Sequence, residues 1–154
     1  MGHLKILIDN RQEAKLPTPP IRQKTEQILN ALGCNDHELS LVIMDDKQIR
    51  ELNKNFMGID KPTNVLSFPM QEGQFSEITP GLLGDVVISL DRAKQEADSA
   101  GILVQERMSQ LLIHGILHLL GFDHEQGENQ AQKMEKKSIE LLRIVEENKE
   151  LNSL

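Results

Sequence analysis

The sequence predicts a single α+β domain with a mixed four-stranded sheet, mostly parallel with one antiparallel edge strand, packed with about five helices. Three observations lead to this class. The chain has 154 residues, which suits one domain. Segments of strand-like alternation and of helical periodicity follow one another in the order β-α-β-α-β-β-α-α-α. No repeat or interdomain linker interrupts them, so the domain is expected to span residues 1–154.

The first third of the chain is predicted to form two strands joined by a helix. Residues 4–8 and 37–44 alternate between apolar and other side chains, as strands do. Between them, Thr18 is expected to cap a helix with prolines in its first turn, and Gly33 is expected to end that helix. A helical crossover between strands favours parallel pairing, so these two strands should be parallel.

The middle of the chain is predicted to form a helix followed by two strands. Asp45 or Asp46 is expected to cap the helix, which stops near Gly58. Residues 62–69 contain a short strand bracketed by prolines, which favours an antiparallel edge position because proline cannot donate to a sheet. Residues 84–90 read as a buried strand. The sequence does not fix the order of the strands in the sheet.

Three helices are predicted in the last third of the chain. Asp91 is expected to cap a short helix that ends at Gly101. Residues 104–120 form the most apolar helix, and a break at Gly121 follows it. Residues 128–147 form a charged helix with apolar positions along one side.

The composition limits the classes of partner. The chain has a net charge of −7 and a pI of about 5.2, whereas general polyanion binders usually carry an excess of basic residues. It has no Trp or Tyr and four Phe, which disfavours a base-stacking platform. DNA is therefore not an expected partner, and recognition of RNA or phosphate must be local. Apolar runs are too short to span a membrane, and no membrane partner is expected.

Cysteine usage indicates a cytoplasmic protein. Cys34 is the one cysteine, so neither an internal disulfide nor a thiolate-rich zinc site can form. The N-terminus offers no secretory cleavage signal.

Three histidines near residue 120 predict a metal site on the long apolar helix. His114 and His118 are four residues apart, so both imidazoles lie on one helical face and can reach one ion. Gly121 can adopt a positive φ and turn the chain back, which brings His124 within reach as a third ligand. Three neutral imidazoles leave the fourth tetrahedral position open, as in catalytic zinc sites.

The residue after the first histidine distinguishes between two kinds of zinc hydrolase. The spacing matches that of the metzincin peptidases, in which a Glu directly after the first His acts as general base. Here that position is Gly115, so the usual peptidase mechanism lacks its base. A zinc ion with neutral ligands lowers the pKa of bound water toward ~7 and can hold an anionic oxygen. This suits phosphodiester hydrolysis at least as well as amide hydrolysis, and a metallopeptidase-like hydrolase is the alternative.

Three sequence blocks together resemble one known family. The histidine block at residues 114–124 closely resembles the signature of the YbeY family of bacterial rRNA-maturation endoribonucleases, and residues 52–69 and 83–88 match in the same order. The resemblance covers about residues 36 to 145. The first 35 residues match only in their strand-then-helix pattern. Three blocks in order are far more specific than the histidine motif alone.

The resemblance implies a function that spacing alone does not give. It implies a zinc-dependent, single-strand-specific endoribonuclease that acts in 16S rRNA 3′-end processing, ribosome maturation and quality control. It implies one Zn²⁺ per chain on His114, His118 and His124, with catalysis by the zinc-bound water. The partners implied are the 16S rRNA precursor, the ribosomal small subunit and assembly factors, in the cytoplasm.

One position departs from the family pattern. Members of the family typically have an Arg just before the Gly of the Gly-x-Asp-Lys-Pro block, where this chain has Met57. Either Arg50, Lys54 or Lys61 substitutes for it as a substrate-binding cation, or activity is weak. A zinc-stabilised ribosome-assembly factor with little catalysis is therefore a further alternative.

Asp85 is the remaining candidate for the catalytic site. It follows Gly84 at the start of a buried strand. Its carboxylate could orient a zinc-bound imidazole or position water, because metal-bound histidines usually donate their second N–H to such a partner. It could equally be a polar strand terminus.

Overall fold

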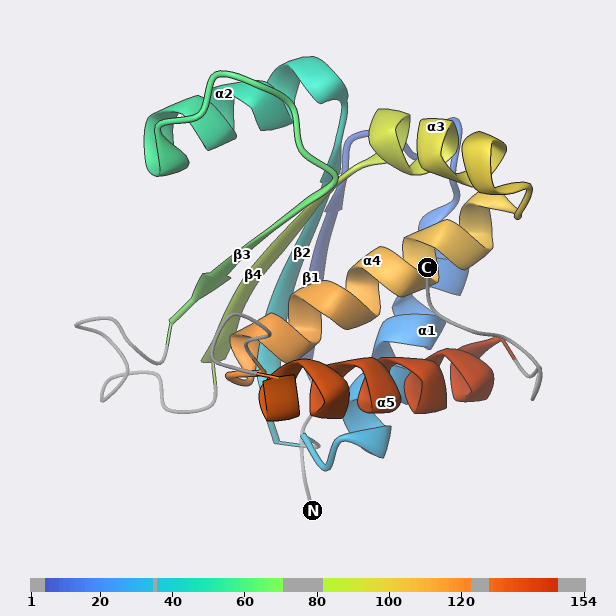
Figure 1. The fold of residues 1–154 in the computed structure, drawn as a ribbon. Coiled ribbons are helices and arrows are strands. Elements are labelled where there is room, and N and C mark those ends of the chain that lie inside the picture. The colour runs from blue at the N-terminus through green and yellow to red at the C-terminus, as the bar shows by residue number, and fades with distance from the viewer. Residues whose placement is uncertain (1–4, 35, 71–81, 123–127, 147–154) are drawn as a thin grey trace.

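A mixed four-stranded sheet packed with five helices forms the described part of the chain (Figure 1). The computed structural model describes residues 5–34, 36–70, 82–122 and 128–146. The strands are β1 (Lys5–Asn10), β2 (Glu38–Met44), β3 (Val65–Pro69) and β4 (Leu82–Ser89). The helices are α1 (Thr18–Ala31), α2 (Asp46–Met57), α3 (Leu90–Ala100), α4 (Val104–Leu119) and α5 (Glu128–Val145).

The strand order in the sheet is β1-β2-β4-β3. β1 and β2 pair in parallel, β2 and β4 pair in parallel, and β3 pairs antiparallel with β4. The predicted fold class, the parallel pairing of the first two strands and the antiparallel edge strand are therefore confirmed. β4 has buried apolar side chains on both faces, with Val86 and Ile88 on one and Val87 on the other, as suits an internal strand.

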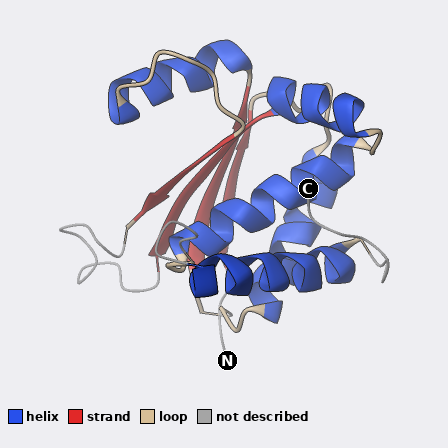
Figure 2. Ribbon diagram, viewed as in Figure 1, coloured by secondary structure: helices blue, strands red, loops and turns tan. Residues whose placement is uncertain are grey.

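Helices cover both faces of the sheet (Figure 2). Buried side chains of α1, α4 and α5 form the larger core with one face of the strands. A smaller core lies on the other face, where Ile49 of α2 packs with Met44, Leu66 and Val87. Successive residues of a strand point to opposite faces. Accordingly, Val86 contributes to the larger core and Val87 to the smaller one.

The predicted cap at the start of α2 is confirmed. The Asp45 carboxylate accepts a hydrogen bond of 2.8 Å from the backbone N–H of Gln48. The Gln48 side chain in turn accepts one of 3.3 Å from the backbone N–H of Asp45, which completes a capping box. At the other end, Gly58 adopts a φ of 71°, which places the left-handed turn where the sequence predicted the helix to stop.

Two predicted caps are wrong by one or two residues. Pro17 is the N-cap of α1 and makes no side-chain capping bond, while the hydroxyl of Thr18 accepts a hydrogen bond from Asn10 instead. Ser89, not Asp91, caps α3 with its hydroxyl oxygen. Asp91 lies in the first turn of α3 and accepts a hydrogen bond of 2.9 Å from the first backbone N–H of α2. The carboxylate thus joins two helices rather than ending one.

Helix α4 lies unusually close to the sheet at Gly115. A methyl group at this position would lie 2.7 Å from Cγ1 of Val86 and 3.3 Å from the hydroxyl oxygen of Ser67. Ser67 donates a hydrogen bond of 3.0 Å to the Gly115 carbonyl, so the edge strand binds the helix backbone directly. Although α4 is the most buried helix, no described helix is both long and apolar enough to cross a membrane.

Replacing Gly115 with Ala is expected to lower the free energy of unfolding by about 1–3 kcal/mol, because the added methyl overlaps a stiff Val86 side chain. The loss should occur although Ala is the better helix former by about 1 kcal/mol. Urea denaturation of the wild type and the variant measures it.

The control for this substitution is a double-mutant cycle. Val86→Ala removes the atom that the new methyl would meet, so Gly115→Ala should cost less in that background. An equal cost in both backgrounds would show that the contact does not limit the approach of α4.

Candidate functional site

His114 and His118 lie side by side on α4. Their ring centroids are 4.7 Å apart, with an angle of 62° between the ring planes. Both side chains are partly exposed on a helix whose other residues at this end are largely buried. The predicted common face of the two imidazoles is therefore present.

The C-terminal end of α4 has the glycine turn that the sequence predicts. Gly121 has a φ of 90°, and its N–H donates to the carbonyl of His118 at 3.1 Å. The N–H of Phe122 donates to the carbonyl of Leu117 at 3.0 Å. These bonds close the C-terminal end of the helix. His124, the predicted third ligand, lies outside the described residues.

The predicted metal site can be assessed only in part. Among residues 5–34, 36–70, 82–122 and 128–146, no three His, Cys, Asp or Glu side chains come together as a metal site. His114 and His118 form a pair of imidazole donors on one face, to which His124 would have to be added from beyond Gly121. Imidazole nitrogens are common zinc ligands, so the pair fits two of the ligand positions of a zinc site. The zinc site itself stays a prediction.

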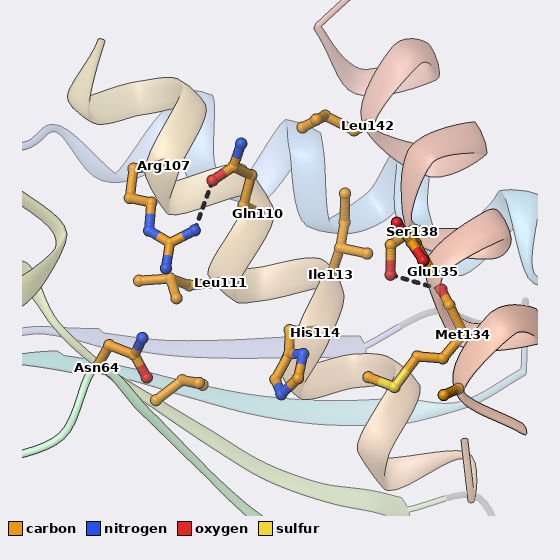
Figure 3. Close-up of a pocket in the computed structure, with 12 residues that line it drawn as sticks. Asn64, Arg107, Gln110, Leu111, Ile113, His114, Met134, Glu135, Ser138 and Leu142 are labelled. Atoms are coloured by element: carbon orange, nitrogen blue, oxygen red, sulfur yellow. Dashed lines mark hydrogen bonds between the residues drawn. The ribbon is translucent and has the colours of Figure 1, made fainter. Parts of the chain in front are cut away.

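A cavity of about 340 Å³ lies beside His114, between α4, α5 and the start of β3 (Figure 3). Apolar side chains of all three elements form much of its wall. Its polar lining residues are Asn64, Arg107, Gln110, His114, Glu135 and Ser138. The cavity therefore brings an imidazole, a guanidinium, a carboxylate and neutral hydrogen-bonding groups to one hollow.

Arg107 is held in this cavity by a polar network that links three segments. Its Nε and Nη2 atoms lie 3.0 and 2.9 Å from Oε1 of Glu96 on α3, and its Nη1 donates to Oε1 of Gln110 at 2.6 Å. The Asn64 side chain donates to the same Glu96 carboxylate at 3.2 Å, and its backbone carbonyl accepts from the N–H of Ser89 at 3.0 Å. Arg107 is consequently fixed from two sides, with 14% of its side chain exposed.

The sequence analysis did not single out Arg107, Gln110 or Asn64. One available signal was spacing, because Arg107 precedes His114 by seven residues, or about two helical turns. The other was the resemblance itself, since Asn64 belongs to the matched block at residues 52–69. Neither signal identifies Glu96 as the partner of both side chains, because that contact depends on how α3 packs beside α4.

The two predicted substrate-binding cations lie elsewhere. Arg50 pairs with Asp60 at 2.7 Å, and both side chains are 54% exposed. The hydrogen bond from Arg50 lowers the pKa of Asp60 and raises the pKa of Arg50 in return. The backbone carbonyl of Lys61 accepts a hydrogen bond of 2.9 Å from the buried Asn53 side chain. Neither Arg50 nor Lys61 lines the cavity beside His114.

Met57 also lies apart from the cavity lining. It is 47% exposed at the end of α2, next to Phe56 at 66%. The Phe56 ring contacts Phe68 of β3 edge-on, with 5.5 Å between the ring centroids. The position of the family arginine is therefore on an exposed corner of the molecule, where α2 meets the edge strand.

Asp85 lies on the opposite face of the sheet from the histidines. Its neighbour Val86 faces Gly115 of α4, and successive strand residues point to opposite faces. Val87, two residues from Asp85, packs against Ile49 of α2 on that other face. The structure does not bring Asp85 together with His114 or His118, so the reading as a polar strand residue fits better.

Gly115 occupies the position at which a metzincin peptidase has its general base. Gly115 faces Val86 and Ser67 of the sheet, where even a methyl group would be crowded. A Glu at this position could not occupy the space as it stands. The glycine is thus required by the packing of α4, and the peptidase alternative loses its base for a structural reason.

Comparisons with known proteins agree on one family. The family model described as Endoribonuclease YbeY matches residues 7–146. A protein of Geobacter metallireducens named Endoribonuclease YbeY is 47% identical over 145 residues, covering 93% of this chain and 97% of its own length. A protein of Aquifex aeolicus with the same name is 47% identical over 122 residues, covering 79% of each chain.

A solved structure has the same architecture. The solution structure of TM1509 from Thermotoga maritima matches with a TM-score of 0.65 and 26% sequence identity, covering 92% of this chain and 88% of that one. The family model spans the two histidines of α4, all of α5 and the sheet except the first two residues of β1. On the strength of the sequence match and the fold, this chain belongs to the YbeY endoribonuclease family.

Proposed function

We propose that this chain is a zinc-dependent, single-strand-specific endoribonuclease that acts in 16S rRNA 3′-end processing, ribosome maturation and quality control. The observation that carries the proposal is the paired imidazoles of His114 and His118, the first of which lines a cavity, in a chain of an endoribonuclease family. Hydrolysis of a phosphodiester bond needs an activated water and cations that face the phosphate. The family membership supports the hydrolase class, and the site supports the finer chemistry.

The proposed metal is one Zn²⁺ per chain on His114, His118 and His124. The close ring contact of the first two residues places two donors on one side of α4, and the positive φ of Gly121 ends the helix three residues before His124. A zinc ion held by three imidazoles would supply a Lewis acid and a bound water with a pKa near ~7.

The side chains of this chain would perform the remaining tasks. His114 and His118 hold their positions because α4 is anchored to the sheet at Gly115, so their geometry does not depend on a loop. The cavity beside His114 has a volume near the lower end of ligand pockets and can accept part of one unpaired strand, not a duplex. The buried apolar residues around the histidines exclude bulk water from this side of α4.

The proposed partners are the 16S rRNA precursor, the ribosomal small subunit and its assembly factors, in the cytoplasm. The resemblance and the family match support these partners. An acidic chain needs a specific binding geometry for RNA, which an assembly intermediate of the ribosome would provide.

A specific observation also favours a second function. Met57 stands where the family typically has an arginine, and it is exposed on a corner outside the cavity. A zinc-stabilised ribosome-assembly factor with little catalysis would need the histidine site but not that cation. Cleavage assays distinguish the two functions.

Zinc content tests the metal assignment. His118→Ala should lose zinc during dialysis, because two remaining imidazoles hold the ion far more weakly than three. Metal analysis of the purified protein should give about one zinc per wild-type chain. His37→Ala removes a histidine directly before β2 and serves as the matched control, which should keep its zinc. Full zinc retention by His118→Ala would overturn the assignment.

Cleavage of defined RNAs tests the reaction. The zinc-loaded protein should cut a single-stranded RNA that spans the 3′ end of 16S rRNA and leave the same sequence intact when it is base-paired. His114→Ala should abolish cleavage, because it removes a proposed zinc ligand at the cavity wall. Zinc-loaded wild type that binds small subunits but cuts no single-stranded RNA would favour the assembly factor instead. Zinc-dependent digestion of casein would favour the peptidase.

A further inference from the structure

Arg107 is the cation that lines the cavity beside His114 within the described part of the chain. It lies on α4 two helical turns before His114, and both side chains face the same hollow (Figure 3). Asn64 of the matched family block faces them from the start of β3. The proposed function assigns no role to Arg107.

The guanidinium of Arg107 keeps donors for a ligand. It has five N–H groups. Glu96 lies against the edge formed by Nε and Nη2, at 3.0 and 2.9 Å, and Gln110 accepts from Nη1 at 2.6 Å. These described contacts use three of the five N–H groups, which leaves one on each Nη atom. Each of these N–H groups can donate a charge-assisted hydrogen bond to a phosphate oxygen.

Holding Arg107 in position leaves Gln110 with a buried polar group that lacks a partner among the described residues. The carboxamide oxygen of Gln110 faces Arg107, and as a result its Nε2 is buried without a hydrogen-bond partner among the described residues. A buried amide without a partner is unfavourable, and such exceptions in native proteins call for an explanation. Orienting Arg107 toward the cavity provides one, because Gln110 and Glu96 together fix the plane of the guanidinium.

The spacing along α4 indicates which phosphate Arg107 would meet. Seven residues of α-helix correspond to a rise of about 10 Å between Arg107 and His114. A strand lying along this face would place the bond to be cut near His114 and a neighbouring phosphate near Arg107. The contact would therefore determine which phosphodiester bond of the RNA lies at His114. It would not stabilise the charge that develops on the reacting phosphate.

We infer that Arg107 is a substrate-binding residue that holds a phosphate of single-stranded RNA next to the bond cut at His114, with Glu96 and Gln110 as its positioning partners. The inference rests on the proposed endoribonuclease function. It also explains how this chain can bind a substrate phosphate through an arginine although Met57 stands at the usual arginine position. Arg107 comes from α4 and not from the end of α2.

Binding of a labelled single-stranded RNA to the full chain tests this inference. Fluorescence anisotropy across a salt series, in chelator so that the RNA stays intact, gives the slope of log affinity against log salt concentration. Arg107→Gln should bind roughly tenfold more weakly, and its slope should fall by about 0.7, the value of one phosphate contact on a single strand. With zinc, the same variant should show a raised KM and a kcat within about twofold of wild type.

Two further variants separate binding from structure. Glu96→Gln removes the charge of one positioning partner but keeps Arg107, so it should weaken RNA binding less than Arg107→Gln does and leave the slope unchanged. Arg11→Gln makes the same charge change as Arg107→Gln near β1, at the opposite edge of the sheet from β3, and should keep the wild-type slope. A merely structural role for Arg107 would make Glu96→Gln and Arg107→Gln weaken binding alike.

The outcomes that overturn the inference are distinct from those that overturn the function. Wild type that binds and cuts single-stranded RNA while Arg107→Gln keeps the same slope and KM would overturn the inference alone. Equal weakening in Glu96→Gln and Arg107→Gln would overturn it as well. Wild type that neither binds nor cuts any single-stranded RNA would overturn the proposed function, and the inference with it.

Discussion

The contact between α4 and the sheet at Gly115 is the constraint on which the candidate site depends. With no side chain at this position, the helix backbone comes close enough to β3 for Ser67 to donate a hydrogen bond to it. The face of α4 that includes Gly115 is thereby committed to the sheet. His114 and His118 are left on the flank that remains partly exposed, so one packing contact decides both where the helix lies and which way its imidazoles face.

Two arginine–carboxylate pairs illustrate how burial changes what an ion pair does. Arg50 and Asp60 are each 54% exposed, and water and salt screen most of their attraction, so the pair adds little to stability. Arg107 and Glu96 are 14% and 33% exposed, and Asn64 binds the same carboxylate. This pair ties α3, α4 and the segment before β3 together. The Arg50–Asp60 pair lies on an exposed corner of the molecule, whereas the Arg107–Glu96 pair lies at one end of the cavity.

Local sequence signals predicted the elements and the histidine pair, while long-range contacts escaped them. The spacing of His114 and His118 and the turn at Gly121 follow from helix geometry within a few residues, so the sequence was sufficient. Strand alternation puts Asp85 and Val86 on opposite faces, but that Val86 faces α4 is a tertiary contact, so the sequence alone did not assign Asp85 to the α2 side. The place of β4 between β2 and β3 depends on pairing between distant segments, which no local pattern encodes. The caps of α1 and α3 were wrong because several polar residues compete there, and contacts with other segments decide among them.

The net charge of −7 limits the kinds of contact through which this chain can bind RNA. Long-range attraction to a polyanion requires an excess of cations over the surface, which is absent here. Affinity must then come from a few contacts whose geometry is set in advance, since a rigid cation loses less entropy on binding than a flexible one. A part-buried arginine fixed by Glu96 and Gln110 on a helix that is itself anchored to the sheet meets that requirement, whereas exposed lysines on the charged α5 do not. The same rigidity makes binding depend on the spacing of phosphates along an extended strand, and this dependence favours single-stranded RNA over a duplex.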